Sequence, residues 1–205
     1  MTAWVFAAGR MLGLGSVAGI RPSMTLVVIG VMSKLGWGAG LNPTFSFLDH
    51  WLAIVIFVVL ALLESSFDKI AKLDRLQGRL TMPYRLVAGG AAGAATIPFG
   101  WQGVVVGAVV GAGAAWTSTY VKGLTRPKTV PSDAVLTLMS LWEDLAVFAG
   151  ALLTLIVSPV GYGIAAFTGI VYWRVGSRRR AKYRAMRRRR AQPPRRDGPR
   201  DDDEQ

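Results

Sequence analysis

Six mostly apolar stretches, separated by short polar segments, run through the first 175 residues of the chain. A membrane-spanning helix needs roughly 20 mostly apolar residues to cross about 30 Å of hydrocarbon. The pattern therefore predicts an all-α, polytopic membrane bundle of about six transmembrane helices over residues 1–175. The stretches are residues 3–32, 51–63, 83–98, 104–121, 134–157 and 161–173.

The first stretch is too long for a single straight span. Near its centre it carries Gly19-Ile20-Arg21-Pro22, and a proline inside a helix removes a backbone donor and clashes with the preceding turn. We expect a kink or a break there. The stretch then crosses once, or its two halves cross separately and the bundle has seven spans.

The amino-acid composition excludes several kinds of catalytic and metal site. The chain is 52% hydrophobic and 18% charged, and it contains no cysteine and a single histidine. Disulfides, thiol nucleophiles and cysteine-ligated metals are excluded, and a histidine-based metal site or triad is not expected. We predict no enzyme activity, no cofactor and no metal.

Basic residues gather in the connections after the second and fourth stretches and after the sixth. Lys and Arg accumulate on the cytoplasmic side of membrane proteins, so we expect a multi-pass protein of a bacterial plasma membrane with both termini in the cytoplasm. Residues 176–205 hold 12 of the 24 Lys and Arg. They predict a disordered cytoplasmic tail that begins as a basic helix and ends in a Pro-rich acidic stretch.

This tail has two interpretations. The residues Arg178–Arg190 are suited to anionic lipid headgroups, near which each cation contributes about 1 kcal/mol. Contact with nucleic acid is less favoured, because aromatic residues are not interleaved with the arginines.

Glycine recurs every fourth residue at Gly103, Gly107 and Gly111. This spacing places the three glycines on one helix face, where they let another helix backbone approach closely. We interpret them as a helix-packing surface.

Several charged residues lie inside or next to the apolar stretches. Glu64 and Asp68 share a helix face at the end of the second stretch, with Lys69 beside them. Glu143 and Asp144 fall about 15 Å into the fifth stretch, where a charge costs several kcal/mol unless it faces protein, water or an opposite charge.

We therefore expect Arg21 to pair with Glu143 or Asp144, and Lys69, Lys122 or Arg126 to meet Glu64 and Asp68 at the cytoplasmic rim. Two interpretations of this intramembrane charged site stay open. The ions clamp helices together, or they line a polar cavity that binds an ion or small solute and contains a carboxylate able to exchange a proton. A carboxylate-bound divalent cation is a weaker third alternative, because no histidine or phosphate-binding motif accompanies the acids.

The order and spacing of these motifs resemble a known family. Gly19-Ile20-Arg21-Pro22, the Leu63–Ile70 motif, Lys122 with Arg126, and Glu143-Asp144 together are similar to the bacterial membrane family called domain of unknown function 4126. The resemblance spans roughly residues 9–160 and implies an all-helical integral membrane protein, without supplying an activity. In place of an Arg-Pro pair at the start of the third helix, this chain has Pro83 before Arg85.

The expected function is a small ion- or proton-coupled permease that forms a homo-oligomer in the bilayer. Arg21 would be an anion contact or counter-ion, and Glu143 with Asp144 the central proton or cation site. Glu64, Asp68 and Lys69 would form a cytoplasmic gate. The alternative is a non-transporting membrane scaffold whose basic tail binds anionic lipid or a partner.

Overall fold

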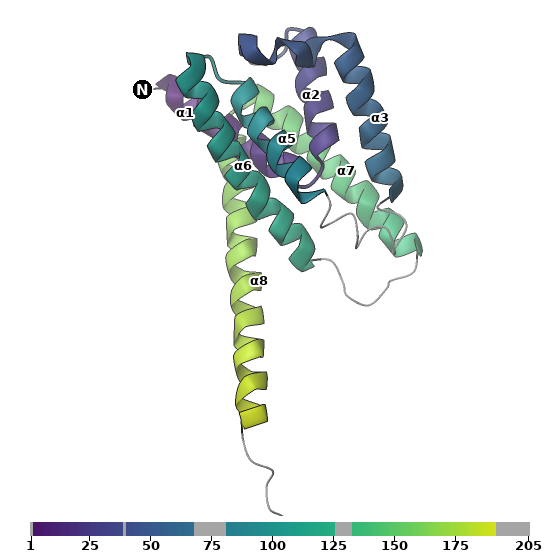
Figure 1. Cartoon of the computed structure of the whole chain (residues 1–205), viewed down its shortest axis with the longest axis vertical. Helices are drawn as coiled ribbons and strands as arrows, with labels where there is room; N and C mark the ends of the chain where they lie inside the picture. Colours follow the sequence, from purple (N-terminus) through teal and green to yellow (C-terminus); the bar gives the residue numbers. More distant parts are fainter. Residues whose placement is uncertain (1, 39, 68–80, 126–132, 192–205) are drawn as a thin grey trace, which may run out of the picture.

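The computed structural model describes residues 2–38, 40–67, 81–125 and 133–191, which form helices and connections with no strand. Each predicted apolar stretch corresponds to one helix, except the first, which forms two (Figure 1). The helices are α1 (Thr2–Ala18), α2 (Pro22–Lys34), the 3-10 helix η1 (Pro43–Asp49), α3 (Trp51–Phe67), α5 (Met82–Ala95), α6 (Gly100–Thr125), α7 (Asp133–Ile156) and α8 (Val160–Ala191).

The expected break in the first stretch is confirmed. Helix α1 ends at Ala18, and α2 begins at Pro22 with Arg21 as its N-cap. Proline is well suited to this first helical position because its missing N–H would have no partner there. The proline therefore ends one helix and starts the next.

The two halves of this stretch fold back on each other. Gly9, at the middle of α1, lies against Ser158, and Gly38, shortly after α2, lies against Leu155, so both helices run from the break toward the junction of α7 with α8. Helices α1 and α2 thus form a hairpin whose turn points into the bundle (Figure 1). With 17 and 13 residues, the two arms are about 26 and 20 Å long, which is short for a span.

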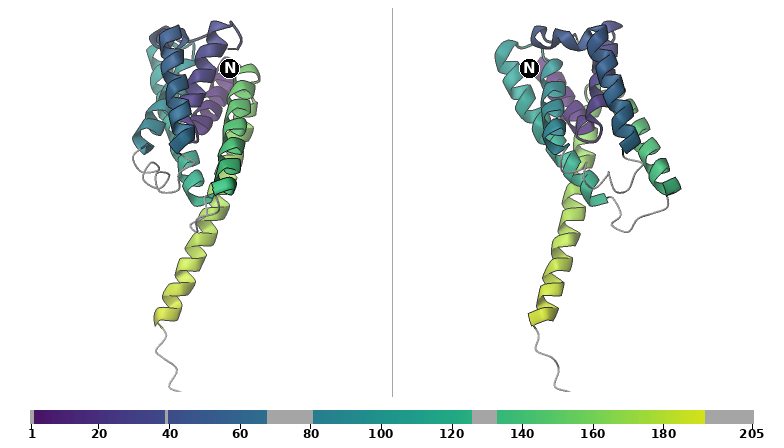
Figure 2. Two further views of the ribbon diagram at one scale, coloured as in Figure 1. Left: turned by 90° about the vertical axis from the view of Figure 1, so that its right-hand side faces the viewer. Right: turned by 45° about the vertical axis from the view of Figure 1, so that its right-hand side comes forward.

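The hairpin helps to set where the two ends of the chain lie. The N-terminal end of α1 and the C-terminal end of α8 lie at opposite ends of the bundle in every view (Figures 1 and 2). The expected placement of both termini in the cytoplasm stays a prediction.

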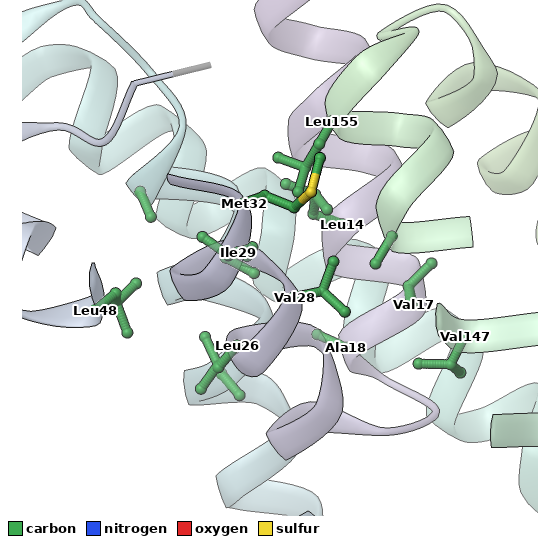
Figure 3. Packing of buried hydrophobic residues seen from close by; sticks show 14 residues of the cluster. Leu14, Val17, Ala18, Leu26, Val28, Ile29, Met32, Leu48, Val147 and Leu155 are labelled. Carbon is green, nitrogen blue, oxygen red and sulfur yellow. The ribbon is translucent and has the colours of Figure 1, made fainter. Parts of the chain in front are cut away.

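The core lies where the hairpin meets α7. Leu14 and Val17 of α1, Met32 of α2, and Val147 and Leu155 of α7 belong to one cluster of buried apolar side chains (Figure 3). Close packing of these residues holds both arms of the hairpin against α7.

Glycine and alanine bring α5, α6 and α1 into backbone contact. A Cβ on Gly111 would overlap the carbonyl oxygen of Gly89, and one on Gly107 would lie 2.8 Å from the Cα of Ala94. A Cβ on Gly103 would meet Ile97 in the connection between α5 and α6 at 2.7 Å. Gly107 and Gly111 thus face α5 at distances that admit no side chain.

The apolar helices are consistent with a membrane protein, but six spans are not confirmed. By length and hydropathy 2 described helices qualify as spans, Gly100–Leu124 and Thr137–Ile156, and up to 3 if Pro43–Asp49 and Trp51–Ser66, bent by 67°, count as one. Large apolar side chains such as Leu52, Leu62 and Leu141 are exposed on α3 and α7. Apolar patches of this extent are rare on water-soluble monomers and mark contact with lipid or protein.

The predicted tail is partly helical. Helix α8 continues to Ala191 and projects away from the bundle (Figure 1). Residues 176–191 belong to this helix, in the part of the tail that was expected to begin as a basic helix. Residues 192–205 lie outside the described residues, and the disorder expected there stays a prediction.

Candidate functional site

The break between α1 and α2 is the centre of the site. A helix that ends among apolar groups leaves backbone carbonyls without helical partners, and each must find a donor. The carbonyl oxygen of Arg21 accepts bonds from the amide and hydroxyl of Thr25, at 3.2 and 2.9 Å. The two preceding carbonyls, those of Gly19 and Ile20, turn to other helices.

Side chains from α5 and α6 donate to these two carbonyls. The oxygen of Gly19 accepts from Arg85 Nη1 at 3.0 Å and from Thr119 Oγ1 at 2.8 Å. The oxygen of Ile20 accepts from Lys122 Nζ at 3.3 Å. Cations also interact favourably with the negative end of a helix dipole, so Arg85 and Lys122 stabilise the end of α1.

Arg21 joins α2 to α7. Its Nε lies 2.8 Å from Oδ1 of Asp144, and its Nη2 donates to Ser140 Oγ at 2.7 Å. The Ser65 hydroxyl of α3 donates to Oδ2 of Asp144 at 3.0 Å. Asp144 therefore receives both the guanidinium of α2 and a hydroxyl of α3, close to the midpoint of α7.

Two further ion pairs join other helices. Glu64 Oε1 of α3 lies 3.7 Å from Arg85 Nη2 of α5, and both side chains are more than nine-tenths buried. Lys122 Nζ of α6 lies 3.0 Å from Oε2 of Glu143 on α7. A buried charge without a partner costs several kcal/mol, so each pair offsets the cost of placing its two members in the bundle.

A pocket opens beside the Arg21–Asp144 pair. Its volume is about 250 Å³, and it lies between α2, α3 and α7. Apolar residues form much of its wall, and four polar residues, Arg21, Glu64, Ser65 and Asp144, complete the lining. The arrangement can hold a small molecule next to carboxylate and hydroxyl oxygens.

The described residues contain no group of three or more His, Asp or Glu that could hold a metal ion. Glu64 and Asp144 share the pocket, but Glu143 is turned to Lys122 and does not line it. Glu64, Glu143 and Asp144 therefore do not form a single metal-binding group, and Asp68, the fourth acid of this set, lies outside the described residues.

Comparison with known proteins identifies the family of the chain. The family model described as "Domain of unknown function (DUF4126)" matches residues 9–178, most of the chain and all of the site. The chain belongs to this family. The description of the DUF4126 family names no function, so membership supplies no activity. No curated protein and no solved structure matches the chain.

The structure brings together only some of the residues expected to meet. Arg21 contacts Asp144, one of its two expected partners, whereas Glu143 contacts Lys122. Lys122 was expected to pair with Glu64 at the rim. Its Nζ instead contacts the Ile20 carbonyl at the break and the carboxylate of Glu143. The remaining expected residues, Asp68, Lys69 and Arg126, lie outside the described residues.

Arg85 and Thr119 were missed as site residues. Arg85 pairs with Glu64 and caps Gly19, and Thr119 donates to the same carbonyl. For Arg85 a signal existed, because a cation within the apolar stretch 83–98 is expected to face a buried partner. For Thr119 there was none, since its role depends on a carbonyl that the helix break exposes.

Proposed function

We propose that this protein is a small ion- or proton-coupled permease that binds its solute in the pocket beside the α1–α2 break. One observation carries the proposal: ionisable side chains line a cavity of about 250 Å³ next to a broken helix. Interrupted helices with polar groups near mid-membrane are also the way secondary transporters build their solute sites.

The residues divide into two groups. Asp144 and Glu64 line the pocket and would contact the solute, with Arg21 as the counter-ion of Asp144. Glu143 and Lys122 lie outside the pocket lining and hold the end of α1. Asp144 would therefore contact the solute, whereas Glu143 would hold Lys122 at the helix break.

A membrane scaffold is the second candidate. It is favoured by the pairing of all three described carboxylates of the site with cations from other helices. Such pairing suffices to hold five helices together, with no solute required.

Further parts of the proposal concern location and partners. We place the protein in the plasma membrane as a homo-oligomer, without enzyme activity. The arginine-rich segment Arg178–Arg190 would contact anionic lipid, since clustered cations next to a membrane helix bind such headgroups.

A flux assay tests permease against scaffold. Full-length protein is reconstituted into liposomes that contain a pH-sensitive dye, and both luminal pH and the uptake of radiolabelled solute are followed after addition of Na⁺, K⁺, Cl⁻ or small organic ions. The permease predicts solute uptake, with a change in luminal pH if protons are the coupling ion. Uptake should be lost in Asp144→Asn and retained in Val59→Phe, whose side chain is exposed outside the pocket lining.

The scaffold predicts a different result. Wild-type liposomes would then behave as empty ones with every solute, while Asp144→Asn would reduce the yield of monodisperse protein. That combination would refute the permease.

A further inference from the structure

The pocket combines two kinds of surface. Met24 and Val27 of α2 together with Val58, Ala61 and Leu62 of α3 form an apolar wall. The polar residues Arg21, Glu64, Ser65 and Asp144 belong to the same lining. A molecule that fills the pocket must therefore have an apolar body and a polar group.

The polar group that the pocket accepts is set by which side chain is accessible. The side chain of Arg21 is 2% exposed, whereas that of Asp144, its ion-pair partner, is 22% exposed. The guanidinium is further occupied by Ser140 through Nη2. The accessible charge of this pair is thus the carboxylate.

The neighbouring groups strengthen this bias. Glu64 lines the pocket, but its partner Arg85 does not. Ser65 directs its proton to Asp144 Oδ2, which leaves the lone pairs of its hydroxyl as acceptors. The pocket thus presents oxygen acceptors, while the nearby cations are turned to other partners.

We propose that the pocket binds an amphipathic organic cation, a primary ammonium group attached to a small apolar body. The N–H groups donate to the oxygens of Asp144 and Ser65, and the hydrocarbon part packs on Val58 and Met24. This inference rests on the proposed function for the site, and it names the class of solute.

Other solute classes fit less well. A bare metal ion is far smaller than about 250 Å³, and hard cations such as Ca²⁺ require roughly six to eight oxygen ligands, more than two carboxylates and a hydroxyl supply. An anion requires accessible donors, but the accessible member of the central pair is Asp144. A neutral apolar molecule would leave the polar lining without compensation.

Binding to protein in lipid nanodiscs tests the proposal. The probe is radiolabelled 2-phenylethylamine, a cation at neutral pH, with empty nanodiscs of the same lipid as the blank. We expect saturable binding that neither 3-phenylpropionate, an anion of similar shape, nor neutral 2-phenylethanol displaces.

Two variants locate the site. Asp144→Asn should weaken binding at least about tenfold, because it removes a charge-assisted hydrogen bond. Val58→Phe should weaken binding by filling the pocket, and Val59→Phe, at an exposed position outside the lining, should not. If Asp144→Asn does not give monodisperse protein, the comparison of Val58→Phe with Val59→Phe alone tests whether the amine binds in this pocket.

Three results would overturn the inference: no saturable binding of the amine, equal displacement by the anion, or binding unchanged in both Asp144→Asn and Val58→Phe. Its failure is separable from that of the permease. If the amine binds but no solute is transported, only the permease function is refuted. If an anion is transported and competes for this pocket, only the assignment of an organic cation as the solute is refuted.

Discussion

Substitution of alanine for Gly111 should loosen the contact of α6 with α5. A Cβ at this position would overlap the carbonyl oxygen of Gly89 and lie 3.0 Å from the Cα of Gly93, inside the optimal carbon–carbon separation of about 3.5–4.0 Å. Both neighbours are backbone atoms, which cannot rotate away as a side chain would. The helices must therefore separate, and the packing between them is lost.

The magnitude follows from two opposing terms. Overpacking a close contact costs about 1–3 kcal/mol, while replacement of a helical glycine by alanine contributes up to about 1 kcal/mol in favour of the helix. Gly113 lies on the same helix, and a Cβ added there would have no neighbour within 4 Å, so Gly113→Ala should show only the second, favourable term. Gly111→Ala should thus be about 1–3 kcal/mol less stable than Gly113→Ala.

Reversible unfolding in mixed micelles, with SDS as denaturant and helicity as the signal, measures this difference. Comparison of two glycines in one helix removes any general effect of helix propensity. Equal stability of the two variants, within about 0.5 kcal/mol, would refute the backbone contact between α5 and α6.

Three further predictions concern the break, the cap of η1 and the C-terminal tail. Thr119→Val, which removes a donor to the Gly19 carbonyl, should lower the free energy of unfolding by about 1 kcal/mol. Thr117→Val, which removes only a hydrogen bond to Gly113 within the same helix, should cost less in the same unfolding assay. Asn42→Ala should cost about 1 kcal/mol by thermal unfolding, because Asn42 caps η1 and also donates to the Ile97 carbonyl. Deletion of residues 178–205 should leave any flux of the reconstituted protein unchanged; lost flux with normal insertion would contradict the separation of tail and pocket.

Local features of the fold were predictable from the sequence. An interruption near Arg21 was predictable from Pro22, because a proline disturbs its own helix through local backbone geometry. That Arg21 would meet either Glu143 or Asp144 followed from the cost of isolated charge at that depth. Both predictions rest on forces that need no knowledge of the packing.

Features set by packing were not predictable in the same way. The return of α2 toward the end where α1 begins depends on contacts such as Met32 with the cluster around Leu155, which are distant along the chain. The pairing of Glu64 with Arg85 was missed for a similar reason, because it depends on how α3 and α5 are placed relative to each other. Sequence spacing identifies which residues need partners, but the helix arrangement decides which partners they find.

The ion pair between Arg21 and Asp144 joins the helix break to α7, and a double-mutant cycle measures the strength of this contact. Arg21→Met, Asp144→Asn and the double variant are compared with the wild type by reversible unfolding in mixed micelles. Contact at 2.8 Å predicts a coupling energy of at least about 1 kcal/mol, with the double variant more stable than the two single losses together would give. Losses that add to within about 0.5 kcal/mol would show that the two side chains do not meet and would contradict the account of the site.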